Sequence, residues 1–359
     1  MRIGKNPYKG TGGEGKAYIG KKVTAAMLTF IPNFMGYYRE RFDLLKLSIE
    51  SLIKHTDSNL ADILVLDNGS CEEVRAYLQQ LHNQGSITYY VQSKHNLGYN
   101  GGLNWIYSAC QSSYLSYSDD DVFFHPGWLE KALEVHENFP SIGMVSCSPS
   151  KTKFGDHHES SKCLPERYPD LVKRRMSSKE WEQEWDILFL NSVGSSISAF
   201  PDIAALEIPI LESNHVECFP LSTHFHYVLS KAALDCLYPF PVGDLMSSNI
   251  NNPLFDMRLI FDKKLDDEGF AKVTTLGMYT EHLGNVWSTR ADVLKKKYML
   301  NTDSHIESNH LKNVSTWKQR IAFKFMNIPV MGKIPYRIYE AMFDLINAKN
   351  NFDRNKSTK

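Results

Sequence analysis

The stretch from Tyr114 to Asp121 reads YLSYSDDD and joins an apolar, aromatic segment to three consecutive aspartates. The aromatic and apolar residues predict a β-strand. Adjacent carboxylates repel one another, so a strand that ends in three of them needs a positive charge beside it. A divalent cation is the usual partner, because hard cations prefer oxygen ligands. A solvated acidic turn is the alternative that this stretch alone leaves open.

Upstream of this stretch, strand-like and helix-like segments alternate along the chain. The periodicity predicts strands over 23–30, 62–67 and 87–91, and helices over 42–53, 72–81 and 103–110. This order predicts an α/β fold, with a Rossmann-like, mainly parallel central sheet that is flanked by helices. Ligands of such sheets bind beyond the carboxyl ends of the strands. Thr29, Asp67 and Asp119 all fall at these ends.

Composition and charge describe an ordinary globular protein. The chain has 359 residues, of which 42% are hydrophobic and 23% charged, and its formal net charge is −1. It contains no apolar run of transmembrane length, and its first residues lead into no signal-peptide core. The six cysteines form no Cys-x-x-Cys pair, so we expect free thiols in a cytoplasmic, reducing compartment.

The distribution of residue types predicts three segments. Residues 1–22 are rich in Gly and Lys and predict an arm, and residues 23–290 form the α/β domain. Within this domain we expect two halves, over 23–145 and 146–290. Residues 291–359 carry more Lys and Arg than Asp and Glu, and they predict a basic, amphipathic helical extension.

Two further segments carry polar groups and glycines in positions that suit a ligand. Asp67-Asn68-Gly69-Ser70 places a carboxylate and a tight turn at a strand end. The segment from Asn96 to Asn104 reads NLGYNGGLN, in which the glycines permit close backbone approach. A glycine-rich connection into a helix remains the alternative for this second segment.

Taken in order, these motifs resemble the inverting family 2 glycosyltransferases of GT-A fold. The resemblance rests on Thr29 after the first strand, Asp67-Asn68-Gly69-Ser70, the Asn96–Asn104 segment, Asp119-x-Asp121, and His125-Pro126-Gly127-Trp128-Leu129. It covers Val23 to Gly143 most strongly and Pro220 to Asn285 less strongly.

The resemblance implies a role for each matching residue in binding the sugar-nucleotide donor. Thr29 and Asp67 would bind the base and ribose of the nucleotide. The nucleotide wall would be formed by Asn96, Gly98 and Asn104. Asp119 and Asp121 would be the two ends of the metal-binding Asp-x-Asp motif, while Asp120 would face the ribose or the donor sugar.

The resemblance also implies a metal and a general base. The metal would be Mn2+ or Mg2+, with His282 of Glu281-His282-Leu283-Gly284-Asn285 closing its site. Asp256 takes the position of the base, although Phe255 and Arg258 stand where the family usually has acids. The alternatives for this role are Asp244, Asp262 and Glu217.

Other aromatic and imidazole side chains allow two interpretations each. His224 and His226 alternate like strand residues and would either line the sugar pocket or lie partly buried in a strand. Trp181 and Trp185 would stack on a sugar or, as the more common role, pack a helix.

The resulting functional prediction is a metal-dependent, inverting glycosyltransferase of polysaccharide biosynthesis. It would move a sugar from a nucleoside diphosphate, with a UDP-sugar favoured, to a hydroxyl of a glycan or lipid-linked glycan. The basic extension predicts a peripheral position at an anionic inner membrane face, and no nucleic acid partner is expected. A sugar nucleotidyltransferase and a non-catalytic glycan-binding module are the alternative functions.

Overall fold

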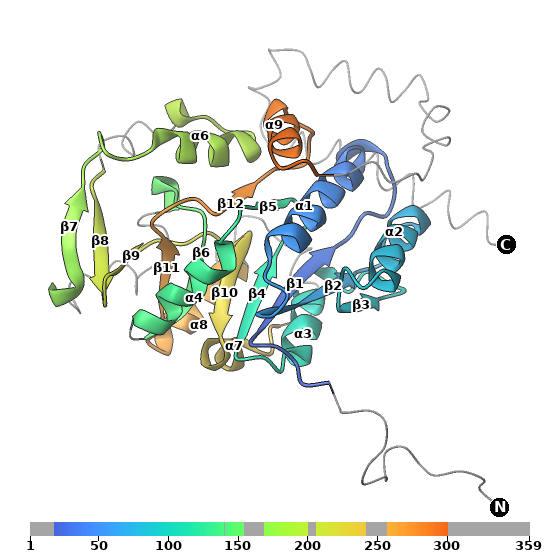
Figure 1. The fold of residues 1–359 in the computed structure, drawn as a ribbon, viewed down its shortest axis with the longest axis horizontal. Coiled ribbons are helices and arrows are strands. Elements are labelled where there is room, and N and C mark those ends of the chain that lie inside the picture. Colours follow the sequence, from blue (N-terminus) through green and yellow to red (C-terminus); the bar gives the residue numbers. More distant parts are fainter. Residues whose placement is uncertain (1–17, 140, 154–168, 200–205, 242–256, 301–359) are drawn as a thin grey trace, which may run out of the picture. The chain divides into compact units, whose positions relative to one another are not determined.

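The computed structural model describes residues 18–139, 141–153, 169–199, 206–241 and 257–300 (Figure 1). Most of the predicted arm, nearly all of the predicted basic extension, and Asp256 and Asp244 lie outside these residues. Within the described part, no helix has the length and apolar character needed to cross a membrane. The five described cysteines are free, which confirms the expectation for those positions.

The centre of the fold is a sheet with the strand order β3-β2-β1-β4-β10-β6-β11-β9-β8-β7, and β5 and β12 pair separately. The strands are β1 (Val23–Thr29), β2 (Ala61–Asp67), β3 (Tyr89–Gln92), β4 (Tyr114–Ser118), β5 (Val122–Phe124), β6 (Ile142–Ser146), β7 (Val172–Met176), β8 (Ile208–Ser213), β9 (Val216–Phe219), β10 (His226–Ser230), β11 (Ala271–Thr275) and β12 (Thr280–His282).

The helices lie on both sides of this sheet (Figure 1). They are α1 (Arg41–His55), α2 (Glu72–Asn83), α3 (Gly98–Ala109), α4 (Trp128–Asn138), α6 (Gln183–Ser192), α7 (Lys231–Leu237), α8 (Met257–Asp267) and α9 (Thr289–Lys297). Short 3-10 turns occur at Gly36–Tyr38, Lys151–Lys153, Pro169–Leu171 and Ile197–Ala199.

Strand β1 shows why both faces of the sheet are covered. Successive side chains of a strand point to opposite faces. Val23, Ala25 and Met27 pack with residues of α1, α2 and α4, whereas Ala26 and Leu28 pack with residues of α3, α7 and α8. An apolar residue is therefore needed at nearly every position, and all seven residues of β1 are buried.

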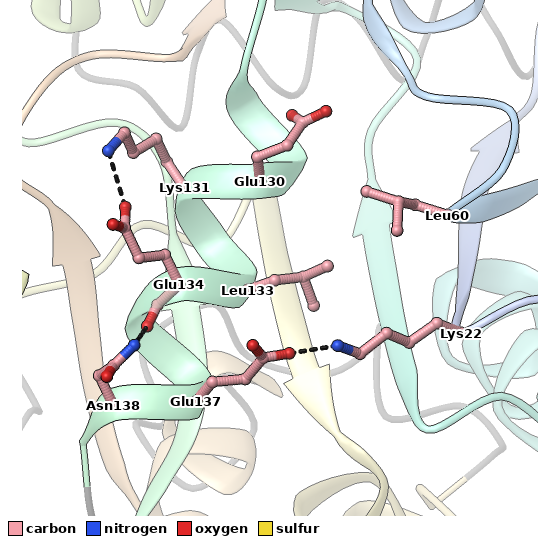
Figure 2. Close-up of a pocket in the computed structure, with 8 residues that line it drawn as sticks. All are labelled: Lys22, Leu60, Glu130, Lys131, Leu133, Glu134, Glu137 and Asn138. Carbon is pink, nitrogen blue, oxygen red and sulfur yellow. Dashed lines mark hydrogen bonds and ion pairs between the residues drawn. The ribbon is translucent and has the colours of Figure 1, made fainter.

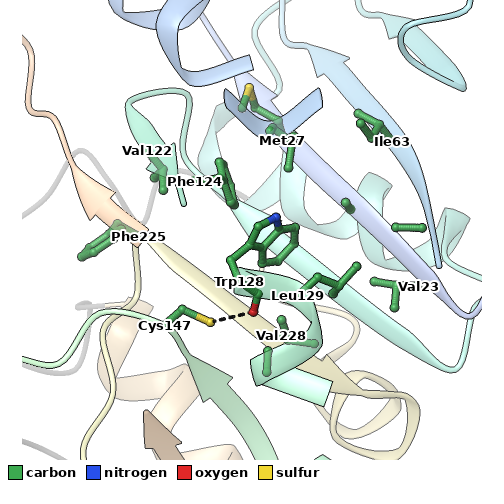
Figure 3. Close-up of a cluster of buried hydrophobic side chains, with 14 of the residues drawn as sticks. Val23, Met27, Ile63, Val122, Phe124, Trp128, Leu129, Cys147, Phe225 and Val228 are labelled. Atoms are coloured by element: carbon green, nitrogen blue, oxygen red, sulfur yellow. Dashed lines mark hydrogen bonds between the residues drawn. The ribbon is translucent and has the colours of Figure 1, made fainter. Parts of the chain in front are cut away.

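Trp128, the first residue of α4, fills the centre of the first of these cores and is fully buried (Figure 3). Its ring contacts Phe124 with centroids 4.9 Å apart, and its backbone oxygen accepts a hydrogen bond from the Cys147 thiol at 3.5 Å. The His-Pro-Gly-Trp segment thus anchors the chain that follows the aspartates.

The strand pairing confirms the parallel arrangement that the sequence predicts for the first part of the domain. Strands β3, β2, β1 and β4 are all parallel neighbours. Thr29 pairs with Asp67 in the register of β1 and β2. Beyond β4 the sheet continues through β10, which is antiparallel to both β4 and β6. The predicted polar residues therefore meet at one edge of the parallel part.

The folded domain continues past the boundary predicted at residue 290. Helix α9 crosses that boundary, and its Ala291 and Leu294 pack with Leu44 and Leu47 of α1. Ala291, Leu294 and Leu300 are therefore part of a hydrophobic core, because the apolar face of α9 covers a surface that α1 would otherwise expose.

The turn after β2 lies close to the loop before α3. Gly69 has a φ of +96°, and a Cβ at this position would lie 3.2 Å from the backbone nitrogen of Asn96 and from the carbonyl carbon of His95. A side chain is therefore disfavoured here by backbone conformation and by space.

Two buried histidines make the stability of the fold depend on pH. His136 of α4 donates through Nε2 to the backbone oxygen of Val228 at 2.9 Å, and burial lowers its pKa to about 4. Burial also lowers the pKa of His226 to about 3. As pH falls below about 6.5, the unfolded chain takes up protons that the folded chain excludes, so stability decreases.

We expect His136→Gln to reduce this acid sensitivity, because glutamine keeps an N–H donor for Val228 but does not titrate. Between pH 7 and pH 5 the unchanged protein should lose about 2 kcal/mol more unfolding free energy than the variant. Urea unfolding at the two pH values measures the difference. Equal losses in both proteins would contradict the assignment to His136.

We expect Gly69→Ala to destabilise the fold more than Gly85→Ala does. Both glycines have positive φ, at +96° and +75°, but a Cβ at Gly85 would meet nothing within 4 Å. The additional loss at Gly69 should be roughly 1 kcal/mol, because only there must the neighbouring backbone move. Urea unfolding of both variants tests this, and equal losses would show that the turn and the loop are not in close contact.

Candidate functional site

The three aspartates occupy the turn between β4 and β5, and their side chains have different partners. Asp119 accepts a hydrogen bond from the Tyr117 hydroxyl at 2.8 Å. Asp120 accepts one from the Thr29 hydroxyl at 2.6 Å. Asp121 lies beside the guanidinium of Arg41, which donates to it. Only Asp120 and Asp121 therefore share a cation.

That cation, Arg41, is the first residue of α1. Its side chain donates to Asp120 and Asp121 and, at 3.4 Å, to the backbone oxygen of Gly284. Arg41 is 8% exposed and both aspartates are 5% exposed, so solvent screens these interactions little. The guanidinium holds together the end of β4, the start of α1 and the chain after β12.

His282 lies on the other side of Asp121. Its Nε2 is 3.5 Å from Oδ2 of Asp121, and its Nδ1 is 2.8 Å from the hydroxyl of Ser192. That hydroxyl donates its own proton to the backbone oxygen of Phe189 at 2.6 Å. Ser192 must therefore accept from Nδ1–H, which assigns the unprotonated nitrogen of the neutral ring to Nε2.

Burial is the main cause of the pKa shifts at this site. Burial, together with the charge of Asp121, raises the pKa of Asp119 to about 8. Burial also raises the pKa of Asp120, although Arg41 opposes this. The pKa of His282 is lowered, mainly by burial, and the neutral ring is favoured.

These residues fit a divalent metal. The Nε2 lone pair of His282 faces a carboxylate oxygen of Asp121, and two acceptors without a proton between them are stabilised by a cation. Carboxylate oxygen and imidazole nitrogen are both suitable ligands for Mn2+. Across the described residues, no group of three or more His, Cys, Asp and Glu side chains could hold a metal. Metals that also bind substrate phosphates often take only one or two carboxylates from the protein.

The structure places only some of the predicted metal ligands next to one another. Asp121 and His282 are neighbours, as the sequence analysis expects. Asp119 is directed toward Tyr117 instead, and Asp120 is the second carboxylate beside the cation. The predicted set of Asp119, Asp121 and His282 does not form one cluster in this structure.

The pairing of β5 with β12 brings Asp121 and His282 together. His282 pairs with Val122, and the backbone N–H of Leu283 donates to the backbone oxygen of Asp121 at 2.7 Å. Next to His282, the buried Glu281 accepts hydrogen bonds from His125 at 2.6 Å and from Arg290 at 2.7 and 2.8 Å. His125 and Arg290 lower the pKa of Glu281 against the effect of its burial.

The predicted nucleotide residues line the adjoining strand ends. Asp67 is fully buried, and its carboxylate accepts from the Ser70 N–H at 2.8 Å. Asn68 donates to Asn96 at 3.1 Å and to the backbone oxygen of Gly98 at 3.2 Å. The Asp67–Ser70 motif and the start of the Asn96–Asn104 segment therefore form one continuous surface, which we call the wall.

Asn104 lies apart from this wall. Its amide bonds to the backbone of Phe240 twice, as acceptor at 2.7 Å and as donor at 2.9 Å. These bonds use both ends of the amide to join α3 to the chain that follows α7, so in this structure Asn104 has a positioning role.

The described alternatives for the general base are held in ion pairs. Glu217 lies 2.7 Å from Lys173. Asp262 is buried between His224 at 3.0 Å and Lys272 at 3.4 Å. His226 is fully buried, so it is the strand residue of the second interpretation. Trp181 and Trp185 pack edge to face, as the helix-packing interpretation expects.

A separate pocket lies between α4 and the start of β1 (Figure 2). Its lining includes Lys131 and Glu134, which form an ion pair at 2.7 Å, and Lys22, which pairs with Glu137. Lys22 precedes β1 whereas Thr29 ends it, so the length of the strand, roughly 20 Å, separates this pocket from the aspartates.

The sequence analysis missed Arg41 and Ser192. One physical signal would have found Arg41: a cation at the first position of a helix is opposed by the helix dipole, so it needs carboxylates nearby. Ser192 carries no such signal, because its role depends on a contact across 90 residues.

Comparison with known proteins supports the resemblance. The model of glycosyl transferase family 2 matches residues 34–186. An uncharacterized glycosyltransferase of Methanocaldococcus jannaschii is 26% identical over 150 residues, which are 42% of this chain and 50% of that protein. The chain thus spans about half the length of this curated relative.

Solved glycosyltransferases show a distant likeness. A mannosyltransferase of Pyrobaculum calidifontis, solved with GDP-Man and Mn2+, matches with a TM-score of 0.43 and 12% identity, over 72% of this chain and 55% of that one. Glucosyl-3-phosphoglycerate synthase of Mycobacterium tuberculosis, solved with Mn2+, UDP and glucosyl-3-phosphoglycerate, matches with a TM-score of 0.38 and 14% identity, over 78% of each chain. Neither likeness is close enough to carry an argument about ligands.

The family model covers α1 through α4 and so includes Asp67, the Asn96–Asn104 segment and the three aspartates. The predicted fold class, with its parallel sheet between helices, is confirmed as well. Residues 34–186 of the chain therefore match the model of glycosyl transferase family 2.

Proposed function

We propose that this protein is a metal-dependent, inverting glycosyltransferase that uses a nucleoside diphosphate sugar, with a UDP-sugar favoured. The acceptor would be a hydroxyl of a glycan or lipid-linked glycan. One observation carries the proposal: Asp121, which lies in the segment that matches the family 2 model, faces His282 beside the strand ends of Thr29 and Asp67. A metal and a nucleotide would then bind side by side.

The strand ends would position the donor. The wall of Asn68, Asn96 and Gly98 would lie along the nucleotide, and Asp67 would lie at its ribose. Mn2+ or Mg2+, when bound at Asp121 and His282, would neutralise the diphosphate and make it a better leaving group.

Asp256 would act as the general base on the acceptor side. Its carboxylate would take the proton of the acceptor hydroxyl as the oxygen attacks the anomeric carbon. The bond from this carbon to the diphosphate oxygen would break on the opposite face, which inverts the anomeric configuration. Asp256 lies outside the described residues, so its role remains a prediction from the sequence. The same holds for the contact of the basic extension with a membrane.

We expect Asp121→Asn to abolish the Mn2+-dependent binding of UDP. The change removes a full charge from the site while keeping the shape of the side chain. In thermal unfolding with a panel of nucleotide sugars, the unchanged protein should be stabilised only when Mn2+ is present. Asp43→Asn on the surface of α1 is the matched control, because Asp43 pairs only locally with Lys46. If Asp121→Asn kept the full stabilisation by UDP and Mn2+, the metal site would be wrong.

We expect Asp256→Asn to lower transfer by roughly 10²–10⁴-fold while sparing donor binding, because an amide cannot accept the acceptor proton. Product formation and UDP-induced thermal stabilisation should be measured on the same samples. Glu217→Gln is the control, since Glu217 is engaged with Lys173 and should tolerate the change. Full turnover by Asp256→Asn would exclude it as the base.

A further inference from the structure

Arg41 binds the carboxylates that the proposed metal would use. Its guanidinium donates to Asp120 and to Asp121 and lies among groups that are almost entirely buried. Asp121 is also the carboxylate that faces Nε2 of His282. The carboxylate oxygens of Asp120 and Asp121 are therefore already bound to Arg41, a cation of the chain itself.

The charges at this site explain why a resident cation is needed. The three aspartates crowd one turn, and Asp120 and Asp121 are each only 5% exposed. Without a positive partner, the pair of Asp120 and Asp121 would be a strongly unfavourable arrangement. The carboxylates keep the pKa of Arg41 raised, so the guanidinium stays charged.

A divalent metal at Asp121 would meet this guanidinium. Two cations that use the same carboxylate oxygens repel each other, and a metal ion needs those oxygens at bonding distance. We propose that Arg41 is a resident counter-cation that competes with the divalent metal for Asp120 and Asp121. Metal binding then requires the guanidinium to leave these carboxylates. This inference rests on the proposed metal-dependent function.

The surroundings of Arg41 offer a place for the displaced side chain. The centre of its guanidinium is 5.9 Å from the ring centroid of Tyr37, in the 3-10 turn before α1. Tyr37 is 45% exposed. A guanidinium over this ring would keep a favourable interaction with the aromatic face while it gains solvent. The backbone of α1 need not change for this movement.

The competition has a consequence for the order of binding. The resident cation neutralises the aspartates when no donor is bound, which lowers the affinity for a metal alone. A donor diphosphate brings further negative charge to the same place, and the site then needs more positive charge than Arg41 supplies. Metal and donor would therefore bind better together than either does alone.

The test is Mn2+ binding to the full chain without nucleotide, measured by electron paramagnetic resonance of free Mn2+. We expect Arg41→Gln to bind Mn2+ roughly tenfold more tightly than the unchanged protein, because a competing charge has been removed. Arg41→Lys keeps a charge but not the two-pronged geometry, so its affinity should lie between the two. Arg174→Gln, which removes an arginine from an exposed ion pair with Glu180, should leave the affinity unchanged.

Thermal unfolding gives a second readout. Arg41→Gln should unfold at a lower temperature than the unchanged protein in a chelator, and Mn2+ should restore more of the loss than it does in Arg174→Gln. If Arg41→Gln does not fold, the comparison of Arg41→Lys with the unchanged protein decides the question. Equal or weaker Mn2+ binding by the Arg41 variants would overturn the competition.

Asp121→Asn separates this inference from the proposed function. If that change abolishes Mn2+ binding while the Arg41 variants bind like the unchanged protein, only the competition fails. If Asp121→Asn leaves Mn2+ binding intact, the metal site itself is wrong and both proposals fail.

Discussion

The buried contact between Arg41 and the pair of Asp120 and Asp121 is the interaction on which the site depends. The carboxyl ends of parallel strands lie at one edge of a sheet, and in this protein carboxylate side chains are located there. Burial makes adjacent carboxylates costly unless a cation lies between them. The start of α1 supplies that cation, so the first helix is tied to the fourth strand by charge as well as by its apolar face.

A second layer of contacts fixes the imidazole that faces these carboxylates. Glu281 is held by His125 and Arg290, and the adjacent His282 is oriented by Ser192. Partners of this kind set the tautomer and direction of a ligand and hold it within a narrow range of positions. The His-Pro-Gly-Trp segment therefore contributes twice, through the packing of Trp128 and through the bond from His125 to Glu281.

The sequence predicts the fold well where a local pattern decides the structure. Strand β1 is apolar at nearly every position because helices cover both faces, and this pattern is visible without a structure. The Thr29 and Asp67 pair is also predictable, since parallel strands align their carboxyl ends. The partners of the three aspartates are not predictable in this way. Asp119 accepts a hydrogen bond from Tyr117, and Asp120 accepts hydrogen bonds from Thr29 and Arg41. The partners of Asp120 are distant in the sequence, so no local pattern predicts them.

Arg41 shows what a sequence pattern for ligand residues omits. The motifs of a family contain the residues that contact its ligands. A residue such as Arg41, whose charge takes the place of a metal ion, is not among them. Its position at the first turn of a helix is nevertheless unfavourable for a positive charge. A buried charge in an unfavourable position needs an opposing charge nearby, and the aspartates meet this need while the donor site is empty. Under the proposed competition, the residue that stabilises the free protein is the one that yields when metal and donor bind.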